Sequence, residues 1–165
     1  YNKRIREPGG FYLPNAPRER KFKTEKYGDK AAFSVVKLPN HKLAADEYMM
    51  ASIRSHDQFN TTIYGLEDRY RGIHNERRVI FMNPKDIEKA GFKPGDKVDL
   101  YNTHNGRERV ARLFVIVPYN IPERNTATYF PETNVLVPID DVAKGSNTPV
   151  SKRVIIKIRL HQPVK

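Results

Sequence analysis

The pair Asn105-Gly106 is the feature that most constrains how this chain can fold. Both residues tolerate the left-handed backbone conformation that a type I′ turn requires, so the pair predicts a tight hairpin between strands near 97–103 and 107–117. The second strand is long and mostly apolar from 110 to 117, as expected of a central strand that is buried on both faces. The hairpin therefore predicts an antiparallel strand pair at the centre of a sheet.

Further short apolar runs, ended by turn residues, predict additional strands at 32–38, 48–53, 79–82, 135–137 and 154–160. One helix is predicted after the third of these runs, because Asn83 is a good N-cap, Pro84 suits the first helical position, and Gly91 ends the pattern. Strands therefore dominate, with few short helices. This mainly β pattern favours a closed barrel over an alternating βα fold.

The first thirty residues differ from the rest of the chain. Residues 1–30 contain prolines, a Gly-Gly pair and a charged run with little apolar periodicity, which predicts an irregular arm. The remaining residues, 31–165, suffice for one domain, since single domains typically have about 100–200 residues. We therefore expect an N-terminal arm over 1–30 and one barrel over 31–165.

The composition limits the chemistry that this stretch can perform. It has no cysteine, which excludes disulfides, thiolate metal ligands and a cysteine nucleophile. Lys and Arg number 30 against 19 Asp and Glu, and the resulting net charge of +11 favours an anionic partner such as nucleic acid, an acidic protein or a phosphate-bearing cofactor. No run approaches the roughly 18 apolar residues of a membrane helix, so we expect a soluble protein with no membrane partner. We also expect a cytoplasmic location.

A polar stretch over 52–64 carries most of the candidate binding groups. Arg54 offers a planar charged fork for a phosphate or a carbonyl edge, and hydroxyl and amide donors can surround an anion from Ser55, Asn60 and Thr61. The stretch therefore predicts a cofactor-binding loop. Polar loops of this kind also close turns and cap helices through local hydrogen bonds, which is the alternative interpretation.

Two neighbouring residues in this loop have distinct expected roles. Asp57 can accept two hydrogen bonds at once, which suits the N–H edge of a guanine, a pterin or a neighbouring arginine. His56 titrates near neutrality, but no acid or nucleophile stands at a recognisable spacing from it, so we expect it to hydrogen-bond or pack. We predict no catalytic residue and no metal ligand in this chain.

Several separated sequence motifs resemble those of one known family and occur in the same order along the chain. They are IRSHDQFNTT at 53–62, the helix and Gly-Asp turn at 83–98, YFPETNVL at 129–136 and TPVSK at 148–152, with a weaker match at 24–33. The chain resembles the molybdopterin-dinucleotide-binding C-terminal domain of molybdopterin oxidoreductases, in the branch similar to formate dehydrogenase alpha subunits and YdeP-like proteins. The resemblance covers roughly residues 20–160, far more than one short motif.

This resemblance implies a six-stranded double-psi β-barrel that is the last domain of a larger oxidoreductase. The implied cofactor is bis(molybdopterin guanine dinucleotide) carrying molybdenum or tungsten, with an iron–sulfur cluster outside this segment and the other domains of the parent enzyme as partners. The barrel would enclose the cofactor and would be inactive in isolation. It requires no cofactor of its own.

The resemblance also implies which residues bind the cofactor. The implied cofactor-binding residues are Arg54, Ser55, His56, Asp57, Gln58, Asn60, Thr61, Asn134 and Lys152. Asn134 would hydrogen-bond a pterin or amide edge, and Lys152 would neutralise charge on the dinucleotide. The alternatives are that Asn134 only satisfies a turn and that Lys152 is a solvated surface cation.

The chain departs from the commoner family pattern in two places. It has Gln-Phe-Asn-Thr-Thr at 58–62 where other members carry Trp-His-Thr, and it contains a long charged insert over 67–78. The insert, with Gly72 and many polar residues, is expected to be a solvated surface loop. It is also a candidate to shape an access channel or a domain contact.

Two other functions compete with cofactor binding. A basic β-barrel that binds nucleic acid would use the excess charge and the nine tyrosines, although no strand alternates aromatic and basic residues. A self-sufficient hydrolase or decarboxylase would need a nucleophile–base pair, and none is recognisable. We therefore favour a cofactor-binding domain and expect no nucleic-acid partner.

Overall fold

The computed structural model describes residues 6–10, 28, 30–31, 33–37, 41–58 and 64–163. The chain divides into two compact units, residues 1–41 and 42–165. Within the first unit, the described residues form no helix and no strand, and a turn is closed where the Gly10 amide donates to the Glu7 carbonyl. The strand expected at 32–38 is therefore wrong for its described residues, 33–37.

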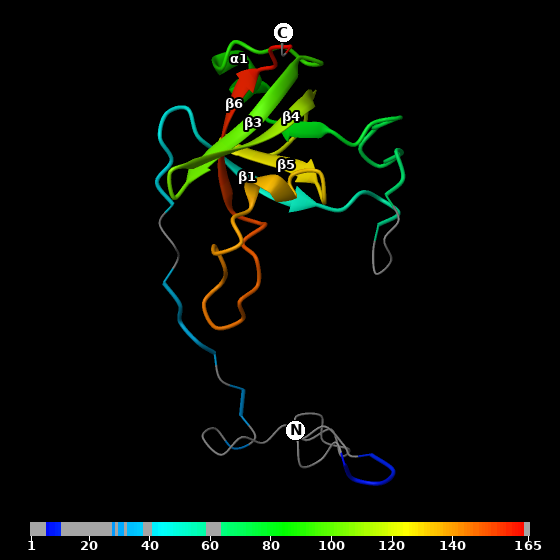
Figure 1. The fold of residues 1–165 in the computed structure, drawn as a ribbon, viewed down its shortest axis with the longest axis vertical. Helices are drawn as coiled ribbons and strands as arrows, with labels where there is room; N and C mark the ends of the chain where they lie inside the picture. The colour runs from blue at the N-terminus through cyan, green and yellow to red at the C-terminus, as the bar shows by residue number, and fades with distance from the viewer. Residues whose placement is uncertain are drawn as a thin grey trace. The chain divides into compact units, whose positions relative to one another are not determined.

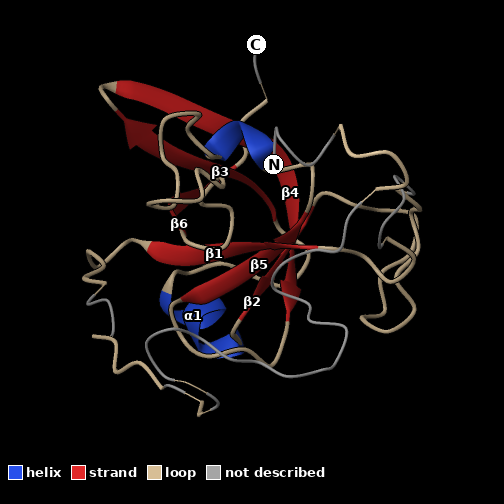
Figure 2. Ribbon diagram, turned by 90° about the horizontal axis from the view of Figure 1, so that it is seen from below, coloured by secondary structure: helices blue, strands red, loops and turns tan. Residues whose placement is uncertain are grey.

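The second unit is a closed six-stranded β-barrel, which confirms the predicted fold class. Around the barrel the strands follow the order β1 (Tyr48–Ile53), β5 (Asn125–Tyr129), β2 (Val79–Met82), β4 (Arg107–Pro118), β3 (Lys97–His104) and β6 (Val154–Leu160). Figure 2 shows β1, β5 and β2 as neighbours, with the helix α1 (Pro84–Lys89) beside β2. Within the described residues, no helix is long and apolar enough to cross a membrane.

The strand directions bring several chain ends to one end of the barrel. β1 and β5 run parallel, and Ile53 pairs with Tyr129 where both strands finish. Figure 1 shows their arrowheads side by side and pointing the same way. β2 and β6 run antiparallel to these strands, so the residues just before Val79 and just before Val154 lie at the same end. We call this end the rim.

The β3–β4 hairpin forms as predicted. Asn105 and Gly106 take positive φ values of 49° and 73°, the left-handed conformation that a type I′ turn needs. The register shifts between Val98 and Leu100, and the buried carboxylate of Asp99 between them accepts a 3.1 Å hydrogen bond from the Leu113 amide. The shift is a β-bulge, which bends the strand and helps the sheet to close.

The helix also forms where it was predicted. The Asn83 side chain accepts from the Lys85 amide at 2.9 Å and caps the first turn, and Gly91 follows the helix with φ 73°. Ile87 is buried in the barrel core. The amide of Arg124 donates to the buried Asp86 at 2.6 Å, which ties α1 to the start of β5. Figure 1 places α1 and the end of β6 together, away from the rim.

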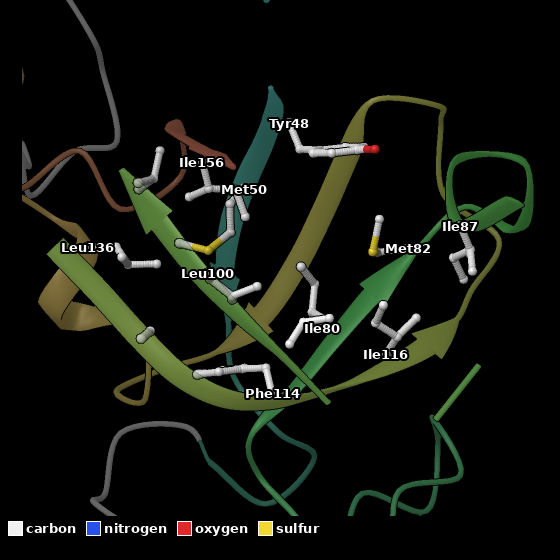
Figure 3. Packing of buried hydrophobic residues seen from close by; sticks show 13 residues of the cluster. Tyr48, Met50, Ile80, Met82, Ile87, Leu100, Phe114, Ile116, Leu136 and Ile156 are labelled. Atoms are coloured by element: carbon white, nitrogen blue, oxygen red, sulfur yellow. The ribbon is translucent and has the colours of Figure 1, made fainter. Parts of the chain in front are cut away.

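The barrel interior is a single apolar cluster. Figure 3 shows side chains from several strands pointing into it, among them Met50, Ile80, Leu100, Phe114, Ile116 and Ile156. A second cluster packs on the outside of the barrel and consists of Ile73, Val79, Phe81 and Tyr129, with Val115 and Val117 against it. In the second half of β4, Phe114 and Ile116 are buried in the interior cluster, whereas Val115 and Val117 are only partly buried on the outside. Leu113 is 41% exposed, so the predicted burial of this strand on both faces is confirmed only in part.

Two expectations between 119 and 137 are wrong. β5 occupies 125–129, where no strand was predicted, because its inward-facing residues are Thr126 and Thr128 and not large apolar residues. The expected strand at 135–137 is instead the 3₁₀ turn η1 (Asn134–Leu136), in which Leu136 is buried and Val135 is half exposed. β5 forms because β-branched threonines fit a strand that pairs with β1 and β2 on its two sides, whereas the described residues of the 135–137 run pair with no strand.

The insert over 67–78 is a mostly exposed loop, as expected, but three of its residues are buried. Asp68, Ile73 and Arg77 are each buried, and Asp68 and Ile73 form an isolated β-bridge. Ile73 belongs to the outer apolar cluster. The insert therefore covers the outside of β2 and β5 next to the rim.

Candidate functional site

Two of the family motifs, the one after β1 and the one after β5, meet at the rim. Residues 54–58 follow β1 and residues 130–134 follow β5, so the parallel pairing of these strands places the two segments side by side. The Phe130 amide donates a 2.8 Å hydrogen bond to the Ile53 carbonyl and extends the pairing past the strand ends. Side chains held just beyond the ends of rigid strands keep their geometry well, which suits a binding site.

The loop over 54–58 is a tight turn with two buried polar side chains. The Gln58 amide donates to the Ser55 carbonyl at 3.1 Å and closes the turn. Ser55 and Gln58 are buried, whereas Arg54 and Asp57 are exposed. The Oε1 atom of Gln58 is buried and has no hydrogen-bond partner in the part of the chain that the structure describes. A buried acceptor of this kind is costly to leave unpaired, so it could accept a hydrogen bond from a ligand or from an ordered water.

His56 is engaged with neighbours in the loop and the insert. Its Nε2 atom lies 3.0 Å from Nη2 of Arg69 and 3.4 Å from the Asp57 carboxylate. Its ring meets the Tyr70 ring edge-on, with the ring centres 4.0 Å apart. His56 therefore both packs and makes polar contacts at the edge of the candidate site.

Arg77 joins the two rim segments, and the sequence interpretation did not identify it. Its buried guanidinium donates to the Ser55 hydroxyl at 2.9 Å, to the Phe130 carbonyl at 2.8 Å and to both oxygens of Glu132 at 2.5 and 3.2 Å. It also donates to the Gly65 carbonyl at 3.1 Å. A signal was present in the sequence, since Glu132 would need a cation if it were buried, but the chain contains fifteen arginines and nothing in the sequence marks one of them as the partner.

A second set of contacts ties the insert to the rim. The Tyr129 hydroxyl donates to Asp68 at 2.7 Å, and Arg71 donates to the same carboxylate at 2.5 Å and to the Arg54 carbonyl at 3.5 Å. Burial alone would raise the pKa of Asp68, but the hydrogen bonds from Tyr129 and Arg71 outweigh it and hold that pKa below its ordinary value. Burial, with the hydrogen bond to Asp68, raises the pKa of Tyr129.

Lys152 and Asn134 also lie at the rim. The Lys152 ammonium donates to the Ser52 carbonyl, and the Ser52 amide donates to the Ser151 carbonyl at 2.9 Å, so the TPVSK motif is attached to the end of strand β1. Asn134 is exposed and begins η1, where its amide donates to the Pro131 carbonyl at 2.9 Å. Asn60 and Thr61 lie outside the described residues.

The other predicted residues thus gather at one end of the barrel. Arg54 to Gln58, Asn134 and Lys152 all follow or precede strand ends at the rim. Arg54, Lys152 and Arg77 bring positive charge to this end, and Glu132 is paired with Arg77. Within the part of the chain that the structure describes, no three His, Asp or Glu side chains are grouped so that they could hold a metal ion.

An open cleft of about 480 Å³ borders the rim beyond Lys152. Its walls come from the end of β3, the start of β6 and the segment after η1, and they include Asn102, His104, Arg153 and Lys157. Nε2 of His104 lies 3.0 Å from the Asp140 carboxylate, and this contact holds the pKa of Asp140 below its ordinary value. The rim is therefore bordered by a polar concave surface next to the end of β3 and the start of β6.

Fold and rim together define a small ligand-binding β-barrel whose polar groups converge at the ends of two parallel strands. The family described as "Molydopterin dinucleotide binding domain" matches residues 48–155, more than half of the chain, and the chain belongs to this family. The match runs from the first residue of β1 into β6 and includes every described rim residue that was predicted. The family resemblance is thereby confirmed, and the nucleic-acid alternative is not supported.

Similar proteins are considerably longer than this chain. An uncharacterized oxidoreductase of Mycobacterium tuberculosis is 47% identical over 164 residues, which cover 96% of this chain and 21% of that protein. The protein YdeP of Escherichia coli is 40% identical over 165 residues, again covering 96% of this chain and 21% of YdeP. The chain therefore spans about a fifth of the length of the curated relatives that it matches.

Proposed function

We propose that this chain is the terminal cofactor-binding domain of a molybdenum or tungsten oxidoreductase that resembles formate dehydrogenase, and that it binds bis(molybdopterin guanine dinucleotide). Family membership and an oxidoreductase among the relatives support the proposal. The barrel itself binds and encloses the cofactor and performs no chemical step. Formate as the substrate, the metal, an iron–sulfur cluster elsewhere in the parent protein and a cytoplasmic location rest on the resemblance alone.

The single observation that carries the proposal is the buried, unpaired Oε1 atom of Gln58 in the rim loop. The N–H edge of a pterin or a guanine would supply the donor that this acceptor lacks. Asp57 is exposed beside it and can accept a pair of N–H groups. The rim thus combines hydrogen-bond acceptors for a base edge with cations for phosphate.

The cationic groups would hold the dinucleotide. Arg54 is exposed at the end of β1, and its planar fork suits a phosphate oxygen pair. Lys152 uses one N–H group on the Ser52 carbonyl, and an ammonium has three, so two remain for the cofactor. Asn60, Thr61 and Asn134 would add amide and hydroxyl contacts, and His56 would pack at the edge of the site.

The Ser55 hydroxyl would have a second role besides contacting the cofactor. It accepts a hydrogen bond from Arg77, which helps to hold the loop, and its own proton can be donated to an oxygen of the cofactor. When bound, the pterin dithiolenes and their metal supply the redox chemistry. The residues of this chain bind, orient and shield that group from water.

The test is the cofactor content of the complete polypeptide. Arg54→Gln and Asn134→Ala should each lower molybdenum or tungsten content and released guanine nucleotide, measured by mass spectrometry of the metal and chromatography of the nucleotide. Arg107→Gln, at an exposed position that begins β4 beside the hairpin turn, is the matched control and should keep both contents. Unchanged contents in both rim variants would refute the assignment.

The substrate and the metal have separate tests. The purified complete polypeptide should reduce an artificial electron acceptor when formate is added, and it should contain one of the two metals in excess over the other. Absence of turnover with formate, in a preparation that holds metal and guanine nucleotide, would rule out formate and leave cofactor binding in place.

A further inference from the structure

We infer that Arg77 is a positioning residue for the candidate cofactor loop: its guanidinium holds residues 54–58 against the segment that follows β5, so that Gln58 and Arg54 keep the orientation that a ligand needs. The inference rests on the proposed function, because it assigns a purpose to the loop geometry. Arg77 acts through other residues and does not itself touch the ligand.

The hydrogen bonds of Arg77 are complete. A guanidinium has five N–H donors, and all five are directed at described residues: one at each oxygen of Glu132, one each at the Ser55 hydroxyl, the Gly65 carbonyl and the Phe130 carbonyl. Because every donor is engaged, Arg77 is held in one orientation. It links Ser55, 22 residues earlier in the chain, to Glu132, 55 residues later.

The surroundings of Arg77 require this planar cation. Its guanidinium carbon lies 5.4 Å from the ring centre of Tyr64 and 5.2 Å from that of Tyr129. The Arg77 side chain is only 6% exposed and that of Glu132 is 16% exposed, so each charge depends on the other for compensation. A lysine could keep the charge pair but could not reach Ser55, Phe130 and Glu132 together, because its donors radiate from one atom.

The partners of Arg77 are concentrated at the rim. Ser55 lies in the loop after β1, Phe130 and Glu132 lie after β5, and none of the three belongs to the apolar cluster inside the barrel. Replacing Arg77 should therefore make the rim loop more mobile while the barrel interior stays packed. Replacing a residue that served stability alone would affect both the loop and the interior.

Arg124 provides a matched control at the opposite end of β5. Its guanidinium also donates to backbone carbonyls, those of Glu47 at 2.9 Å and of Ala44, and lies 5.8 Å from the Tyr48 ring centre. It differs from Arg77 in preceding β5, on the side of α1, where no candidate cofactor residue lies. Arg124→Lys should disturb the fold to a similar degree without disturbing the rim.

The experiment compares Arg77→Lys with Arg124→Lys in the complete polypeptide, at a temperature at which both remain folded. Arg77→Lys should lower guanine nucleotide content about tenfold, the low end of the losses known for residues that orient a metal ligand. It should also speed amide hydrogen exchange at residues 54–58 and not in β3 or β4. Arg124→Lys should keep the nucleotide content and the exchange rates of the loop.

A second variant keeps the inference testable if Arg77→Lys fails to fold. Arg77→Met combined with Glu132→Met removes both charges together, which leaves no unpaired charge and still deletes the contacts to Ser55 and Phe130. It should reproduce the faster loop exchange and the lost nucleotide. Unchanged loop exchange or wild-type nucleotide content in the Arg77 variants, or an equal loss in Arg124→Lys, would overturn the inference. Absence of guanine nucleotide from the wild-type protein would instead refute the proposed function.

Discussion

The hydroxyl of Tyr129 donates a 2.7 Å hydrogen bond to the carboxylate of Asp68, a residue 61 positions earlier in the chain. Tyr129 is the last residue of β5 and Asp68 begins the buried part of the insert, so this bond attaches the insert to the strand that leads to the rim. Arg71 extends the attachment to the Arg54 carbonyl. The insert is consequently part of the support of the candidate site.

Tyr129→Phe should lower the free energy of unfolding by about 1–3 kcal/mol. The substitution removes the donor to a buried carboxylate whose Oδ1 atom already lacks a partner among the described residues, so desolvation of Asp68 is left less compensated. Denaturant unfolding of the purified 165-residue chain measures the change. Tyr119→Phe, at a partly exposed ring that contacts Phe81, is the control and should change stability by no more than about 0.5 kcal/mol. Equal effects of the two substitutions would contradict the role of the Tyr129 hydroxyl.

Stability should fall at acid pH because two buried carboxylates have lowered pKa values. Burial alone would raise the pKa of Asp68 and of Asp99, but hydrogen bonds, to Tyr129 and Arg71 for the first and to His161 and the Leu113 amide for the second, hold both below the ordinary value of 3.8. A carboxyl whose pKa is lower when folded stabilises the protein fully above its unfolded pKa. That contribution is lost as pH falls below 3.8 and through the folded value.

The acid dependence is measured as the denaturant midpoint from about pH 5 down to about pH 2. Asp99→Asn should reduce the slope of stability against pH in this range, at the cost of lower stability near neutrality. Asp57→Asn, at a side chain that is 65% exposed, should leave the slope as it is in the wild type. A slope that Asp99→Asn does not alter would show that other groups govern acid unfolding.

Gln58→Met should have opposite effects on stability and on cofactor content. Removing a buried acceptor without a partner relieves a desolvation penalty, so the free energy of unfolding without cofactor should rise by about 1 kcal/mol. The same change deletes the acceptor proposed for the pterin or guanine edge, and guanine nucleotide content of the complete polypeptide should fall. Gln162→Met, at an exposed position, should alter neither quantity. A destabilised Gln58→Met would indicate that Gln58 already has its partner within the protein.

Leu100→Ala should lower the free energy of unfolding by about 2–5 kcal/mol, because it leaves a cavity inside the closed barrel. Leu100 is completely buried in the central cluster, where Figure 3 shows it among side chains from several strands. Leu160→Ala, at a residue of β6 that is 55% exposed, should stay within about 0.5 kcal/mol of the wild type. Calorimetry or denaturant unfolding distinguishes the two, and similar small losses would mean that the barrel collapses around the gap.

Local patterns in the sequence predicted the elements that depend only on near neighbours. The Asn105-Gly106 turn and the helix α1 after Asn83 formed as expected, because turn dihedrals and capping are decided within a few residues. The apolar run of β2 was also predicted, although this strand forms by pairing with the distant strands β4 and β5. The family motifs also predicted the closed barrel.

The tertiary structure alone decided β5, the insert and Arg77. Thr126 and Thr128 became strand residues because β1 and β2 offered backbone partners on both sides, and no periodicity in the sequence marks that event. Arg77 is one of many arginines until folding places Glu132, 55 residues later, beside it. Charge pairs and buried hydrogen bonds between distant segments depend on which strands become neighbours, so the sequence determined the barrel and its family, while the closed barrel determined how the rim is held.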